Sequence, residues 1–190
     1  MRLLVRTLFC AGITVLRASG SIISFTDTML GTLEVPPNAS TATGSATITI
    51  DTIAQTLTVN EMFSGLLGGP ASTGDIHCCA GEGVAAGIAI PLVGFPITTS
   101  GTYSWQFDLT SAATYTSAFL ISSGGTAFTA ESDLITNMLN GLTYTNIHDT
   151  TFPAGEIRGQ LTQAIPEPGT APLCGACLLA LTLCGTRRRR

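Results

Sequence analysis

The sequence contains no lysine and few charged residues of any kind. Charged side chains make up 11% of its 190 residues, against about 25% in ordinary soluble domains. All basic residues are arginines, and only Arg158 lies between residues 21 and 165, where eleven carboxylates leave a net charge of −10. Such a segment lacks the basic surface that nucleic acid phosphates require, which excludes nucleic acid as a partner. The 45% apolar content excludes a charge-driven disordered chain.

The sequence also lacks the motifs of common catalytic sites. It has no G-x-S-x-G nucleophile turn, and the glycine-rich run over 81–87 does not have the G-x-G-x-x-G spacing of a dinucleotide loop. No D-x-D-x-D calcium loop is present. We therefore expect no catalytic residues and a protein that is not an enzyme.

Residues 1–20 have the layout of a secretory signal peptide. Arg2 and Arg6 precede an apolar run over 7–16, and small residues follow at Ala18 and Gly20. We expect export and a body that spans residues 21–165. The alternative is an apolar anchor that is not cleaved.

Residues 166–190 have the composition of a second targeting signal. Pro166, Glu167 and Pro168 come first, an apolar run over 171–186 follows, and four arginines end the chain. As a helix the run would span about 24–27 Å, a little short of the bilayer core, with the arginines on the cytoplasmic side. This arrangement resembles a PEP-CTERM sorting signal. The resemblance implies a Gram-negative bacterial protein held transiently in the inner membrane by a transmembrane helix. An exosortase would then release it to the cell surface or medium, with a link to exopolysaccharide and biofilm.

The body has the pattern of an antiparallel β-sandwich. Short runs of alternating polar and apolar residues are separated by clusters of glycine, proline, serine and asparagine. The runs over 44–51, 55–63, 101–109 and 156–161 predict strands. In the last, Ile157, Gly159 and Leu161 should face inward, and Glu156, Arg158 and Gln160 outward.

One segment has helical spacing. Residues 129–141 begin with Thr129 as a candidate N-cap and end at Asn140 and Gly141, a natural stop. They predict a single helix of about ten residues between two strands.

Several motifs of the body resemble the CHRD domain family. The opening segment over 25–37 contains Glu34-Val35-Pro36-Pro37, the segment over 42–46 follows at the expected place, and residues 144–148 and 155–161 match the closing signature. Asp75-Ile76-His77 stands where the family has His-Ile-His. The resemblance covers about 25–162 and implies an immunoglobulin-like sandwich. The bacterial members of this family have no generally established activity.

The body has two histidines, and both are candidate metal ligands. His77 and His148, with Asp75 and Cys78, would offer imidazole, carboxylate and thiolate groups that suit zinc or copper. This hypothesis requires two distant segments to meet. The alternative is structural and needs no cofactor. In it, His148 and Glu156 hydrogen-bond to backbone or to Arg158, and Arg158 forms an ion-pair clamp with Glu34 or Glu156.

Cys78 and Cys79 are adjacent in a chain that we expect to enter an oxidising compartment. Three states are open: a strained disulfide that stiffens the loop, a free or intermolecular thiol pair, and a contribution to a metal site.

Three functions follow from these observations. The first is an exported surface or matrix module without enzymatic activity, which contacts exopolysaccharide or surface proteins. The second is a metal-binding or redox protein that uses His77, Cys78, Cys79 and His148. The third, by analogy with chordin, is a module for a peptide or growth-factor-like partner.

Overall fold

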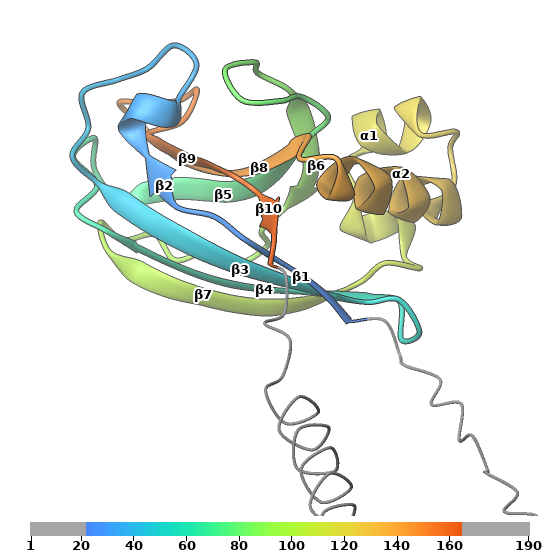
Figure 1. Ribbon diagram of the computed structural model, residues 1–190. Coiled ribbons are helices and arrows are strands. Elements are labelled where there is room, and N and C mark those ends of the chain that lie inside the picture. The colour runs from blue at the N-terminus through green and yellow to red at the C-terminus, as the bar shows by residue number, and fades with distance from the viewer. Residues whose placement is uncertain (1–21, 165–190) are drawn as a thin grey trace, which may run out of the picture.

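The computed structural model describes residues 22–164 of the chain (Figure 1). The predicted signal peptide over 1–20 and the predicted sorting signal with its transmembrane helix over 166–190 lie outside the described residues. Within 22–164, no helix is long and apolar enough to cross a membrane. The described elements are β1 (Ile22–Thr26), β2 (Met29–Leu30), η1 (Gly31–Leu33), β3 (Thr43–Asp51), β4 (Thr56–Ser64), β5 (Ala71–Cys78), β6 (Gly87–Pro91), β7 (Gly101–Asp108), η2 (Ala112–Thr114), α1 (Ser117–Ser122), α2 (Ala127–Leu139), β8 (Thr143–Asp149), β9 (Ile157–Gln160) and β10 (Thr162–Gln163).

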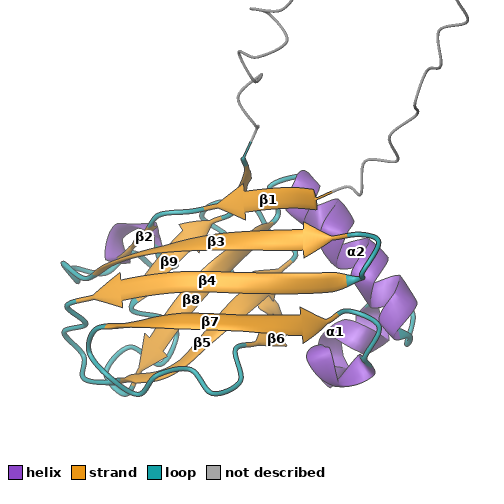
Figure 2. Ribbon diagram, turned by 90° about the horizontal axis from the view of Figure 1, so that it is seen from below, coloured by secondary structure: helices purple, strands orange, loops and turns teal. Residues whose placement is uncertain are grey.

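The strands form two layers with antiparallel pairing, so the predicted β-sandwich is confirmed (Figures 1 and 2). One layer has the strand order β10-β1-β3-β4-β7, and the other has β9-β8-β5-β6. The short strand β2 joins them, because Met29 and Leu30 pair with β3 and Leu30 also pairs with Arg158 of β9. The sandwich is therefore closed along one side.

Strand alternation fills the space between the layers. On β3, Ala46, Ile48 and Ile50 are buried, and their register neighbours on β4 include Val59 and Leu57. Burying such side chains removes apolar surface from water, which supplies most of the stabilising free energy of a sandwich. On β7, Tyr103 and Phe107 are buried, but Trp105, which alternation places on the same face, is 52% exposed. Among residues 22–164, its strand pairs with β4 alone and so forms an edge of the sheet.

The second layer is buried on both faces, which sequence alternation did not predict. Every residue of β8 is buried, and so are Glu156 and Arg158, which were expected to face solvent. The reason is tertiary. The loop over 79–86, here called the cover loop, and the segment over 31–42 contact the outer side of this layer. Figure 1 shows the cover loop, in green, rising above β8 and β5.

The chain between β7 and β8 contains two α-helices, α1 and α2, and the short η2, where one helix was predicted. The two α-helices lie at one end of the sandwich (Figure 2). The predicted helix is α2, but its N-cap is Thr126 and not Thr129. Thr129 is the third helical residue, and the side chains of the two threonines form a capping box. The six-residue α1 was missed because its pattern is too short to show helical periodicity, although Thr116 caps it through Phe119 N.

Candidate metal site

The candidate site lies on the outer side of β5 and β8. Ile76 and Ile147 are fully buried in the core between the layers. Because successive side chains of a strand point to opposite faces, Asp75, His77 and His148 project from the other face. The fold thus brings the two distant segments together on neighbouring strands.

The three side chains present their donor atoms to one another. One atom from each of Asp75, His77 and His148 lies within 4.8 Å of the other two. The Nε2 atom of His148 is 3.5 Å from Oδ2 of Asp75, and the two imidazole centroids are 5.8 Å apart. All three residues are buried, with exposed fractions of 2–8%. Two imidazole nitrogens and a carboxylate oxygen are a donor set that binds zinc, copper or iron in proteins.

In both histidine rings, the hydrogen bond to backbone uses the Nδ1 atom. His77 Nδ1 lies 3.0 Å from the carbonyl oxygen of Ala86, and His148 Nδ1 lies 3.1 Å from that of Pro153. Since a carbonyl oxygen only accepts, Nδ1 carries the proton in both rings. In the neutral imidazole, Nε2 then presents a lone pair. Metal-bound histidines in proteins usually have this arrangement.

Three buried atoms at the centre of the site have no hydrogen-bond partner among residues 22–164. They are Nε2 of His77, Nε2 of His148 and Oδ2 of Asp75. Leaving a buried polar group unpaired costs about 1–3 kcal/mol. A cation held between these three side chains would satisfy such atoms, because each would donate a lone pair to it.

Burial controls the protonation of the site. It lowers the pKa of His77 to about 4, with a smaller opposing effect from the hydrogen bond to Ala86. It raises the pKa of Asp75 to about 6, although His148 and a hydrogen bond from Thr73 act the other way. At neutral pH, His77 is therefore neutral and Asp75 is charged, the states that a metal requires.

The predicted ligand Cys78 is not part of this group. Cys78 forms a disulfide with Cys79, and its side chain belongs to the hydrophobic core. Strand alternation explains this, because the residue after His77 faces the opposite side of β5. The structure therefore has the disulfide alternative and not the free thiol pair.

The CHRD-like motif residues form a network beside the site. Glu156 is fully buried and accepts hydrogen bonds from Ser40 Oγ and from the backbone N–H groups of Leu67 and Gly68. Glu34 lies close to Arg158, whose charge partly offsets the burial that raises the pKa of Glu34 to about 7. Pro36 and Pro37 line a surface hollow next to Glu34.

The expected ion-pair clamp is not formed. Within the described part of the chain, Arg158 pairs with neither Glu34 nor Glu156. Its Nη2 donates to the carbonyl oxygen of Gly81 and to Oε1 of Gln160, and its Cζ lies 3.4 Å from the centroid of the Tyr144 ring. Arg158 thus connects the cover loop to β8 and β9, and it forms no direct ion pair with a carboxylate of residues 22–164.

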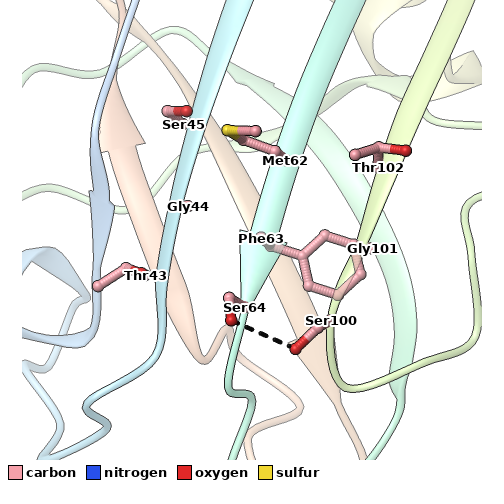
Figure 3. Close-up of a pocket in the computed structure, with 9 residues that line it drawn as sticks. All are labelled: Thr43, Gly44, Ser45, Met62, Phe63, Ser64, Ser100, Gly101 and Thr102. Carbon is pink, nitrogen blue, oxygen red and sulfur yellow. Dashed lines mark hydrogen bonds between the residues drawn. The ribbon is translucent and has the colours of Figure 1, made fainter.

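A separate hollow of about 460 Å³ lies on the other layer (Figure 3). The residues around it come from β3, β4 and β7 or their ends, and include Ser45, Met62 and Thr102. A hydrogen bond from Ser100 Oγ to Ser64 Oγ closes one side. No imidazole, thiol or carboxylate is among its lining residues, so it has no part in the candidate metal site.

Sequence reasoning missed two buried polar residues near the candidate site, Asn146 and Asp149. Asn146 lies opposite both Asp75 and Arg158 in the strand register, and its Oδ1 has no hydrogen-bond partner among the described residues. Asp149 is 1% exposed, and its Oδ1 accepts hydrogen bonds from the N–H groups of Thr151 and Phe152. Asn146 lies between Thr145 and Ile147, and Asp149 between His148 and Thr150, and neither pattern gave a signal of burial.

Comparison with known proteins supports the family resemblance and little else. No curated protein and no solved structure matches the chain at a significant level. The model of the CHRD domain family matches residues 25–161, which include nearly all of the described fold and every residue of the candidate site. The chain therefore belongs to the CHRD domain family.

Proposed function

We propose that the CHRD domain of this chain binds one transition-metal ion through Asp75, His77 and His148. The observation that carries the proposal is the approach of three buried side chains whose facing atoms, two imidazole nitrogens and a carboxylate oxygen, have no hydrogen-bond partner among residues 22–164. Zn²⁺ and Cu²⁺ are the ions whose preferences best fit this set, since both accept imidazole nitrogen together with carboxylate oxygen.

The structural alternative explains less of what is seen. Hydrogen bonds to backbone account for Nδ1 of both histidines and for the oxygens of Glu156. They leave Nε2 of His77 without a partner among residues 22–164, and Nε2 of His148 and Oδ2 of Asp75 have only their 3.5 Å contact with each other. A cluster that only held loops in place would be expected to pair these atoms as well.

We propose further that the protein is an exported, non-enzymatic module of a Gram-negative cell surface. Support comes from the signal-like ends of the sequence and from the acidic, lysine-free body. In this proposal an exosortase-type enzyme processes the tail, and the domain acts among exopolysaccharide or surface proteins. Intact-mass measurement on protein recovered from cells and medium tests this part. A species that starts near Ser21 and lacks the tail supports it, and a full-length chain confined to the cytosol contradicts it.

Metal titration of the full chain tests the binding site. We expect isothermal titration with Zn²⁺ and with Cu²⁺ to show one strong site that is lost in Asp75→Asn, His77→Asn and His148→Asn. The affinity should fall at least about 100-fold in each, because outer-shell changes alone cost 10–100-fold. Asp133→Asn, an exposed acid on α2, is the matched control.

The readout is the difference between wild type and variant, not the total metal content. Four other cysteines, Cys10, Cys174, Cys177 and Cys184, lie outside residues 22–164 and contribute equally to every variant. If the three variants bind as tightly as Asp133→Asn, the proposed site is wrong.

A further inference from the structure

The disulfide lies at the point where the metal site meets its cover. Cys78 directly follows His77 and is the last residue of β5, and Cys79 is the first residue of the cover loop. Cys78 is 7% exposed, whereas Cys79 is exposed at the surface. A reductant that approaches from solvent therefore reaches the sulfur of Cys79 first.

The cover loop makes the contacts that orient the site. Its last residue, Ala86, accepts the Nδ1–H bond of His77 and donates its own N–H to the hydroxyl of Tyr144 at 2.9 Å. Near the other end of the loop, the carbonyl oxygens of Ala80 and Gly81 accept hydrogen bonds from side chains of β9. The orientation of His77 thus depends on the position of a loop that begins at the disulfide.

We propose that the Cys78–Cys79 disulfide controls the metal site, and that a dithiol reductant weakens metal binding by freeing the cover loop. The inference rests on the proposed metal binding. A thiolate of the reductant attacks Sγ of Cys79, the bond between the two protein sulfurs breaks, and Cys78 leaves as a thiolate that takes up a proton. The second thiol of the reductant, as its thiolate, then attacks the mixed disulfide. Cys79 is released as a thiol and the reductant as a disulfide, so two electrons and two protons pass to the protein.

Reduction of the disulfide should change the structure only near the cover loop. Linking adjacent residues constrains little of the unfolded chain, so breaking the link changes global stability only slightly. The ring does fix the backbone where the loop starts, and opening it releases that constraint. Loss of outer-shell support for a metal-binding histidine typically lowers metal affinity 10–100-fold.

The test compares the oxidised full chain with the Cys78→Ser/Cys79→Ser double variant, using Zn²⁺ in calorimetric titrations. We expect the double variant to bind Zn²⁺ about 10-fold or more weakly, with a melting temperature within a few degrees of wild type. Cys174→Ser/Cys177→Ser is the matched control, because it removes another cysteine pair outside the described fold, and it should leave the affinity unchanged. Serine avoids the complication that reduced cysteines bind zinc themselves.

A second measurement uses the wild-type sequence and needs no substitution. Without metal, amide hydrogen exchange over 79–86 should be faster after reduction than before, while exchange in β3 and β4 stays the same. Equal Zn²⁺ affinity in wild type and the folded double variant, or equal exchange in the cover loop, overturns the inference and leaves the metal site standing. Failure of the oxidised wild type to bind Zn²⁺ or Cu²⁺ instead overturns the proposed function itself.

Discussion

The imidazole of His77 and the phenol ring of Tyr144 lie parallel, with centroids 4.6 Å apart and an angle of 2° between their planes. The two residues are register partners on β5 and β8. The Tyr144 hydroxyl accepts a hydrogen bond from the N–H of Ala86, whose carbonyl oxygen is the acceptor for His77. Tyr144 therefore supports His77 both through the stacked ring and through the cover loop.

Replacing Tyr144 should separate these two contributions. Tyr144→Phe keeps the ring but loses the hydroxyl, and we expect a loss of Zn²⁺ affinity of only a few-fold. Tyr144→Leu removes the stack as well and should lower the affinity about 10-fold or more, within the range for outer-shell changes. Calorimetric titration measures both variants, and equal affinities in Leu and Phe variants would show that the stack has no such role.

Glu61 is a carboxylic acid on the core side of β4. It is 3% exposed, and neither of its oxygens has a hydrogen-bond partner among residues 22–164. Burial raises its pKa well above the ordinary value of 4.5, and the nearby Asp27 and Asp75 act in the same direction. The folded protein therefore keeps a proton on Glu61 at pH values where the unfolded chain has released it. Its contribution to stability falls as the pH rises from about 4.5 through the raised pKa.

Glu61→Leu should remove this pH dependence. We expect the free energy of unfolding at pH 7 to rise by about 1–3 kcal/mol, the cost of an unpaired buried polar group. Urea denaturation between pH 4 and 8 measures the difference between variant and wild type, which should shrink toward the acid end. Asp133→Asn should show no such trend. A variant that is less stable than wild type at pH 7 would contradict the prediction.

Glu156 connects the segment over 31–42 and the loop between β4 and β5 to the start of β9. Three hydrogen bonds reach its carboxyl oxygens, from Ser40 at 2.5 Å, from Leu67 at 2.7 Å and from Gly68 at 3.2 Å. Glu156→Gln places an amide group opposite one of these donors. We therefore expect the free energy of unfolding to fall by about 1–3 kcal/mol. A shift of the urea midpoint to lower concentration is the readout, and an unchanged midpoint would count against the network.

Gly155 lies where the backbone passes close to the side chains of Asn146 and Glu34, and a larger residue would not fit there. Its φ is +125°, and an added methyl group would overlap Asn146 and Glu34. Gly155→Ala should lower the free energy of unfolding by more than about 2 kcal/mol, since backbone strain alone costs about 1–3 kcal/mol. Gly94→Ala, with φ of +74° and no atom within 4 Å of the new methyl group, is the control and should cost less. Thermal unfolding compares the two.

The sequence predicted a substantial part of the fold. The alternation over 44–51 and 55–63 placed β3 and β4 within one residue of their observed ends. Helical spacing located α2, but a threonine three residues earlier was the cap, because two threonines at that spacing can exchange roles in a capping box. Short elements such as α1 were beyond sequence reasoning, since six residues do not establish a period.

The structure brings together three of the four residues that the sequence suggested as metal ligands. Asp75, His77 and His148 were named from residue type alone, and the strand register brings their donor atoms together. Cys78 was named for the same reason and was wrong, because it points into the core and is bonded to Cys79. Residue type shows which groups can bind a metal, but only the register of β5 against β8 shows which of them meet.

The sequence alone determined the layer pattern, the family motifs and the short set of possible ligands. These depend on local spacing, which the chain carries in itself. Tertiary structure alone decided that the outer side of β8 and β9 is covered and that Arg158 contacts the ring of Tyr144. It also decided that two imidazole nitrogens and one carboxylate oxygen face one another without hydrogen-bond partners among the described residues. Each of these depends on loops that cross from distant parts of the chain, and their packing removes water from groups that sequence alternation would leave exposed.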